Sequence, residues 1–156
     1  MARATRRPLG PGNGPVDGPE RSPFQPRERP MPMIMICDPR PRHDDVGRVA
    51  DTLLDRGYGV RSFSDGERFL EAAVAQPPDL VVYALGEELE SDLGVLKLLR
   101  RALPDMHLIV LSAQPSLRTR TAVQPLRPIF YAVDPPDPDE VIEVVQTALE
   151  RRERPS

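Results

Sequence analysis

Tryptophan is absent from this sequence of 156 residues, and aromatic residues make up only 4% of it. A buried core must therefore be built mainly from aliphatic side chains, which the 39% of hydrophobic residues can supply. Cys37 is the single cysteine, so an intramolecular disulfide and a cysteine-based zinc site are both excluded. A lone thiol fits a reducing compartment, and we expect a cytoplasmic protein.

Strong charge of one sign and long apolar runs are also missing. The formal net charge is −3, which gives no reason to expect nucleic acid or a membrane surface as the main partner. No apolar run approaches membrane-spanning length, and no signal-peptide core follows the arginines near the N-terminus. Lys97 is the one lysine among 21 basic residues, a bias that indicates a GC-rich bacterial genome.

Proline and glycine are concentrated at the N-terminus. Residues 1–32 can bury too little apolar surface to offset the entropy lost on ordering, and we predict a disordered Pro/Gly/Arg-rich tail there. Two alternatives stay open for this segment. Its proline spacing suits a polyproline-binding partner, and translation could instead begin at Met31 or Met33, where the predicted structure starts.

The rest of the chain alternates short apolar runs with amphipathic segments. The runs predict strands at 33–37, 59–63, 80–85, 108–111 and 129–133, and the segments between and after them predict five helices. With right-handed crossovers this order predicts an α/β fold, a doubly wound five-stranded parallel sheet of the flavodoxin or receiver type, (βα)5. We assign the domain to 33–150 and a short charged tail to 151–156.

The helix ends carry recognisable signals. Ser64 and Glu67 form a capping-box pattern ahead of a helix expected to bury its apolar side chains, including Val74. Asp137 and Pro138 suit the N-cap and the first position of the last helix. Prolines surround the fourth helix, expected at 116–124, and leave open whether it forms.

Ligands of doubly wound sheets bind at the carboxyl ends of the strands, near the switch point. In this sequence the ends are 38–40, 84–86, 112–113 and 134–135. Segments 78–84, 108–113 and 131–140 resemble the receiver domains of response regulators in bacterial two-component systems, and the similarity covers roughly 33–149. The resemblance implies an aspartate after the third strand that accepts phosphate, helped by an acid pair that binds magnesium, a hydroxyl residue and a lysine.

Several positions match that pattern and several depart from it. Asp38 matches the first acid, Ser112 the hydroxyl, Pro135 the proline that follows the lysine, and Tyr131 the switch aromatic. However, Ala84 stands at the phosphoacceptor position and Asp134 at the lysine position, and Arg40 follows Asp38 where a second acid is expected.

These departures have chemical consequences. Ala84 has no carboxylate to attack a phosphoryl donor, Asp38 alone is a poor anchor for magnesium, and Asp134 would repel a bound phosphate. We therefore predict a degenerate receiver, or pseudo-receiver, that transfers no phosphate and holds no metal or cofactor. Glu87 or Asp92 could replace the lost acceptor, although an exposed acidic loop is the more common explanation of such residues. Arg40 offers a cation to a small anion, a third hypothesis.

The resemblance implies a signalling role. We expect no enzymatic activity, because the sequence has no nucleophile–base pair, glycine-rich phosphate loop or metal cluster. We expect a stand-alone adaptor in a bacterial signalling pathway that works without phosphorylation. Its partner would be another signalling protein that binds the face made by the fourth helix, the fifth strand and the fifth helix, and a homodimer through the same face is a second option. Arg118, Arg120 and Arg127 are either a solvated face or part of this docking patch.

Overall fold

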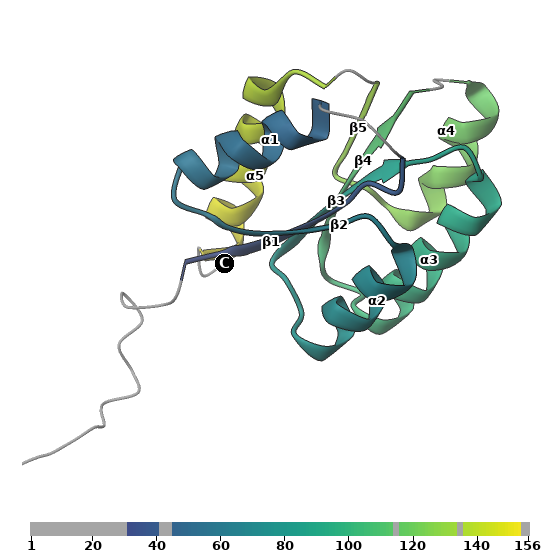
Figure 1. Ribbon diagram of the computed structural model, residues 1–156, viewed down its shortest axis with the longest axis horizontal. Coiled ribbons are helices and arrows are strands. Elements are labelled where there is room, and N and C mark those ends of the chain that lie inside the picture. The colour runs from purple at the N-terminus through teal and green to yellow at the C-terminus, as the bar shows by residue number, and fades with distance from the viewer. Residues whose placement is uncertain (1–30, 41–44, 114–115, 134–135, 154–156) are drawn as a thin grey trace, which may run out of the picture. The chain divides into compact units, whose positions relative to one another are not determined.

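The computed structural model of the protein describes residues 31–40, 45–113, 116–133 and 136–153. Residues 1–30 of the tail predicted at 1–32 lie outside these ranges, which Figure 1 shows in colour. No helix among the described residues is long and apolar enough to cross a membrane.

Five parallel strands form a single sheet in the order β2-β1-β3-β4-β5. They are β1 (Met33–Cys37), β2 (Gly59–Phe63), β3 (Leu80–Leu85), β4 (His107–Ser112) and β5 (Phe130–Val133). The chain steps from β1 to one edge and then back across to β3, so the switch point lies between β1 and β3. Every residue of β3 is buried, which explains why this strand reads as a continuous apolar run.

Helices cover both faces of the sheet, as Figure 1 shows. One face carries α1 (Asp45–Asp55) and α5 (Pro138–Glu153), and the other carries α2 (Gly66–Ala75), α3 (Leu89–Ala102) and α4 (Leu117–Val123). A short 3₁₀ helix, η2 (Gln124–Leu126), follows α4. The doubly wound α/β fold predicted from the sequence is confirmed.

Two apolar layers form the core, one on each face of the sheet. Successive side chains of a strand point to opposite faces, so Val82 and Ala84 of β3 pack in the layer under α1 and α5. Tyr83, between them, packs in the layer under α2 and α3. This alternation decides which side chains at the end of β3 can reach the carboxyl edge of the sheet.

Two predictions for α2 are wrong in detail. The N-cap is Asp65, whose carboxylate accepts a hydrogen bond from the Glu67 amide at 3.0 Å, and not Ser64. Val74 is 51% exposed and not buried, because Phe69 and Ala73, four residues apart, already define the inward face of the helix.

The fourth helix forms in spite of its prolines. Ser116 caps α4 by accepting a hydrogen bond from the Thr119 amide at 3.1 Å. Pro125 lies at the start of η2, where its missing amide costs no hydrogen bond, and Arg127, with a φ of 54°, ends the segment in the left-handed region.

The last helix is longer than predicted at its C-terminal end. It begins at Pro138, with the carboxylate of Asp137 accepting from the Asp139 amide at 3.0 Å, as a capped start requires. It runs to Glu153 and so enters the range assigned to a charged tail. The sequence has no helix breaker before Pro155, which explains the extension.

One guanidinium ties the C-terminal end of α3 to two other segments. Arg100 donates from Nη1 to the Met106 carbonyl at 2.6 Å and to the Pro104 carbonyl at 3.1 Å, both just ahead of β4. Its Nε donates to the Leu126 carbonyl in η2 at 3.0 Å. Backbone carbonyls that would otherwise lack partners are thereby satisfied by one side chain.

We expect Arg100→Met to lower the free energy of unfolding by about 2–3 kcal/mol, because hydrogen bonds from a charged donor to part-buried backbone carbonyls are lost. Urea denaturation of the full chain measures this change. The matched control is Arg101→Met at the neighbouring exposed position, which should cost less than about 0.5 kcal/mol. Equal losses for the two variants would contradict the role given to Arg100.

Candidate functional site

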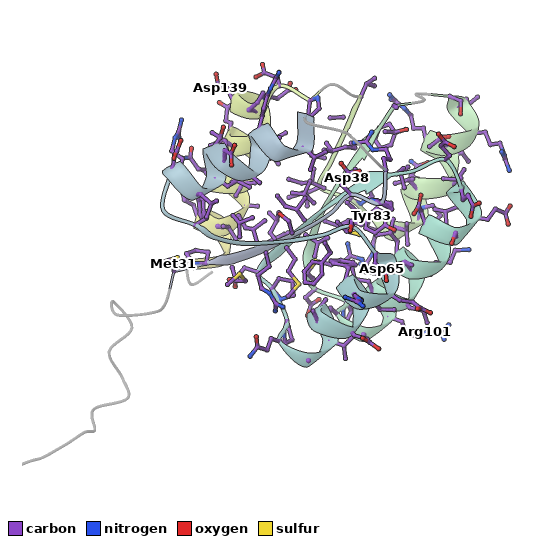
Figure 2. All side chains as sticks on the ribbon, in the orientation of Figure 1. Met31, Asp38, Asp65, Tyr83, Arg101 and Asp139 are labelled. Atoms are coloured by element: carbon purple, nitrogen blue, oxygen red, sulfur yellow. The ribbon has the colours of Figure 1, made fainter. Side chains whose placement is uncertain are left out.

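The turn after β1 reaches the carboxyl edge of the sheet. The Asp38 amide donates to the Phe63 carbonyl at 2.9 Å, which extends the pairing of β1 with β2 by one residue. Figure 2 shows Asp38 at the end of β1 opposite Met31, as the direction of the strand requires. The first acid of the predicted pocket therefore lies at the edge where ligands of such sheets bind.

Asp38 is held in an ion pair with Arg40. Arg40 donates from Nε to Oδ1 of Asp38 at 2.9 Å and from Nη2 to Oδ2 at 3.4 Å. The Arg40 amide also donates to Oδ1, at 3.1 Å, which closes a tight turn. The side chains are only 5% (Arg40) and 14% (Asp38) exposed, so solvent screens this pair far less than a surface ion pair.

Ala84 is fully buried near the end of β3. It lies opposite Leu111 of β4 in the sheet register and packs in the apolar layer under α1 and α5. The position predicted as the lost phosphoacceptor is thus occupied by a methyl group in the core. Nothing at this position can attack phosphorus or bind a cation.

The other predicted pocket residues are only partly brought together. Ser112 ends β4, 2% exposed, opposite Leu85 in the register. Tyr131 on β5 is half-buried, and its hydroxyl finds no hydrogen-bond partner among the described residues. The guanidinium of Arg120 lies 5.2 Å from the centre of the Tyr131 ring, a cation–π contact between α4 and β5. Asp134 and Pro135 lie outside the described residues.

Asp92 does not belong to an exposed acidic loop, which corrects the interpretation favoured from the sequence. The helix α3 already begins at Leu89, and Asp92 in its first turn is 6% exposed. Its Oδ1 accepts from the Tyr83 hydroxyl at 2.8 Å, and its Oδ2 accepts from the Gly86 amide at 2.7 Å. Both oxygens are therefore engaged in binding the β3–α3 connection together.

Burial shifts the proton equilibria of three neighbouring groups. Desolvation raises the pKa of the Cys37 thiol to about 12, and the nearby Asp92 carboxylate adds to this effect. Desolvation, the largest cause, and the neighbouring Cys37 and Asp92 also raise the pKa of Tyr83. The pKa of Asp92 is raised by desolvation, although the hydrogen bonds from Gly86 and Tyr83 oppose that shift. Cys37 is thus an unreactive core thiol and not a nucleophile.

The described residues do not fit a divalent cation. Magnesium requires several oxygen ligands in near-octahedral geometry, but the oxygens of Asp38 and of Asp92 already accept hydrogen bonds, and Ala84 offers none. Within the described part of the chain, no group of three or more His, Cys, Asp or Glu residues is placed to hold a metal.

Two shallow hollows flank Arg40 at the carboxyl edge of the sheet. The first, about 310 Å³, lies between the turn after β1 and the start of α3, with Asp92 in its wall. The second, about 320 Å³, lies toward β4 and α4 and is lined by the hydroxyl residues Ser112, Ser116 and Thr119. Arg40, Gly86 and the exposed Glu87 border both hollows, so the Arg40 side chain separates them.

No family model matches this sequence. Solved structures, in contrast, match over most of the chain. A response regulator receiver domain protein (CheY-like) from Methanospirillum hungatei has a TM-score of 0.68 at 18% identity and covers 79% of this chain and 97% of its own. The signal receiver domain of an HD domain-containing protein from Pseudomonas fluorescens has a TM-score of 0.68 at 20% identity, with 78% and 96% covered. The chain has the receiver-domain fold.

One further structure and one sequence relative bear on the site. A response regulator from Burkholderia pseudomallei, solved with a phosphorylated aspartic acid, a calcium ion and citrate, has a TM-score of 0.64 at 23% identity and covers 78% of this chain and 71% of its own. The nitrogen assimilation regulatory protein NtrX of Azorhizobium caulinodans is 27% identical over 120 residues, which are 75% of this chain and 26% of NtrX. This chain therefore spans about a quarter of that relative.

We expect Asp92 to make stability depend on pH. Folding raises the pKa of Asp92 above its ordinary value of 3.8, so the folded protein binds this proton more tightly than the unfolded chain does. The contribution of Asp92 to the free energy of unfolding of the wild type therefore falls as the pH rises from that value through the pKa of the folded state. In Asp92→Asn this contribution is absent. The free energy of unfolding of the Asn variant minus that of the wild type should therefore rise with pH across this window.

Urea denaturation of both proteins at a series of pH values measures this difference. Other carboxylates contribute equally to the two proteins and cancel. A constant offset is expected as well, because an Asn amide cannot accept from both the Tyr83 hydroxyl and the Gly86 amide. A difference that stays flat or falls as pH rises would show that Asp92 is not the buried acid described above.

Proposed function

We propose that this protein is a pseudo-receiver that serves as a phosphorylation-independent interaction adaptor in bacterial signalling, in the cytoplasm. The observation that carries the proposal is the burial of Ala84, in the core of a receiver-domain fold, at the position the resemblance assigns to the phosphoacceptor. A receiver fold without that carboxylate retains the surfaces of the domain but has no acceptor to couple them to phosphate.

The two acids named as substitutes give little support to a phosphorelay. Asp92 has both carboxylate oxygens engaged and is 6% exposed, so a phosphoryl group could reach it only after the β3–α3 connection opened. Glu87 is exposed, but it would need a second acid to help it bind a metal. Asp38, the acid in the turn after β1, is already paired with Arg40. Of the acids that the structure describes at this edge, Asp38 and Asp92 are both engaged, so neither is free to bind a metal that would neutralise the donor.

The surface best suited to a partner lies around the free edge of β5. This strand ends the sheet and pairs only with β4, so its outer edge presents unpaired backbone groups. Large apolar side chains are exposed at its ends and on a neighbouring helix: Ile129 just ahead of the strand at 43%, Val133 at its end at 41%, and Leu117 on α4 at 79%. We call this surface, with Arg120 and Val144, the β5 edge face.

Charge on the β5 edge face is divided between its two helices. Arg120 and Arg127 are exposed on the α4 side, and Glu140 and Glu143 are exposed on α5. A partner that matches both halves would carry acidic and basic groups about an apolar centre, the anatomy typical of protein interfaces. Another signalling protein is the proposed partner, and a second copy of this chain, which carries the same two halves, is the alternative.

The experiment is capture of partners from an extract of the native cells with the full chain as bait, in the presence and absence of acetyl phosphate and magnesium. We expect the same partners in both conditions, because Ala84 offers no acceptor and both oxygens of Asp92 are engaged. Leu117→Asp should lose those partners at least about tenfold, since it places a charge at the apolar centre of the interface.

The matched control is Leu98→Asp, a charge placed on an exposed leucine of α3 (53% exposed) away from β5. Circular dichroism should show both variants folded. Capture that changes with the donor, or that is lost equally in the two leucine variants, would contradict an adaptor working through the β5 edge face without phosphate.

A further inference from the structure

Arg40 occupies an unusual place for an arginine. Its side chain is 5% exposed although it lies in a turn at the surface of the sheet edge. Its aliphatic part lies over the β3–α3 connection, because a β-carbon built on Gly86 would meet Cγ of Arg40 at 3.7 Å and Cγ of Pro39 at 3.4 Å. The guanidinium is thus brought between the two hollows, beside Asp38, by packing as well as by charge.

The charge at this place is balanced within the chain. The fork of the guanidinium meets the carboxylate of Asp38 through two nitrogens, a geometry that arginine provides and a point charge does not. A divalent ion approaching Asp38 would have to displace these bonds and would then lie a few ångströms from a positive charge. The Burkholderia pseudomallei structure, in contrast, holds a calcium ion together with its phosphorylated aspartic acid.

We infer that Arg40 is a built-in replacement for a divalent cation: its guanidinium neutralises Asp38 and keeps metal ions out of the carboxyl edge of the sheet. Of the features that make the described residues unfit for a cation, this one can be removed by a single substitution. Without the guanidinium, Asp38 keeps the hydrogen bond from the amide of residue 40 but loses its counter-charge. It is then next to Pro39 and Arg40, which line a hollow together with Glu87, Glu88 and Asp92, and it becomes a site for Mg²⁺ or Mn²⁺.

This inference does not depend on the adaptor role, because it concerns the occupancy of the edge and not the β5 edge face. The guanidinium of Arg40 is a positive charge that stays in place, whereas a bound metal ion can dissociate. The state of the turn after β1 is then independent of the magnesium concentration.

The test titrates Mn²⁺ into the full-length protein and follows the broadening of amide signals of residues 37–40 and 85–88 in ¹H–¹⁵N NMR spectra. Wild type should show no selective broadening. Arg40→Met keeps the apolar stem over Gly86 and removes only the charge. It should bind Mn²⁺ at least about tenfold more tightly than wild type, with broadening at these residues and a melting temperature that rises with Mn²⁺.

Two further variants make the result specific. Arg101→Met removes an exposed arginine elsewhere and should behave like wild type. The double variant Asp38→Asn, Arg40→Met removes both charges, so it should be more stable than Arg40→Met alone and insensitive to Mn²⁺. It also provides a folded comparison if the single variant unfolds in the absence of metal.

Three outcomes would overturn the inference. One is selective broadening of residues 37–40 in wild type, which would show that the guanidinium does not exclude metal. Another is an Arg40→Met protein that Mn²⁺ neither broadens nor stabilises. The third is a double variant that binds Mn²⁺ as tightly as Arg40→Met, since Asp38 would then not be the ligand.

Discussion

The carboxyl end of β3 is buried on both faces of the sheet, and each buried polar group near it must therefore find its partner inside the protein. A carboxylate or guanidinium withdrawn from water costs free energy unless it is paired and hydrogen-bonded. Two short networks beside Gly86 meet this requirement: Asp38 with Arg40, and Asp92 with Tyr83 and Gly86. They fix the turn after β1 and the start of α3, the segments that border both hollows.

The same pairing occupies the carboxylates that a phosphate acceptor or a cation site would need. An acceptor carboxylate must be free on one side to attack phosphorus, and a cation site needs carboxylates that are not already hydrogen-bonded. At this edge one acid is neutralised by arginine, another is clasped by a tyrosine and an amide, and the central position, Ala84, has only a methyl group. These features point the same way, and the role that we propose therefore rests on the outer surface of the domain.

Much of the fold follows from the sequence because strands buried on both faces leave a simple signal. The bounds expected for β1, β2 and β3 agree with the structure. β1 and β3 are unbroken apolar runs, whereas β2 is short and mixed and is delimited by Gly57 and by the cap of α2. The helix ends are less well predicted: Asp65 and Ser64 are both good caps, and the sequence cannot show which carboxylate or hydroxyl reaches the amide of Glu67.

The site was predictable in position but not in its contacts. Ala84 could be placed by resemblance, whereas the burial of Asp92 could not, because its acidic neighbours suggested a solvated loop. One signal was present: Tyr83 lies in a fully buried strand, and a buried hydroxyl usually needs a partner. Which side chain supplies that partner depends on where α3 begins, a boundary that periodicity leaves uncertain by a turn.

In the function we propose, the carboxyl edge of this sheet accepts no phosphate. The decisive test is intact-mass spectrometry of the full-length protein after incubation with acetyl phosphate and magnesium, with a phosphorylatable receiver domain treated in parallel. We expect an unchanged mass for this protein while the comparison domain gains one phosphoryl group. An acid-labile gain of the same size that peptide mapping places within residues 84–92 would contradict it.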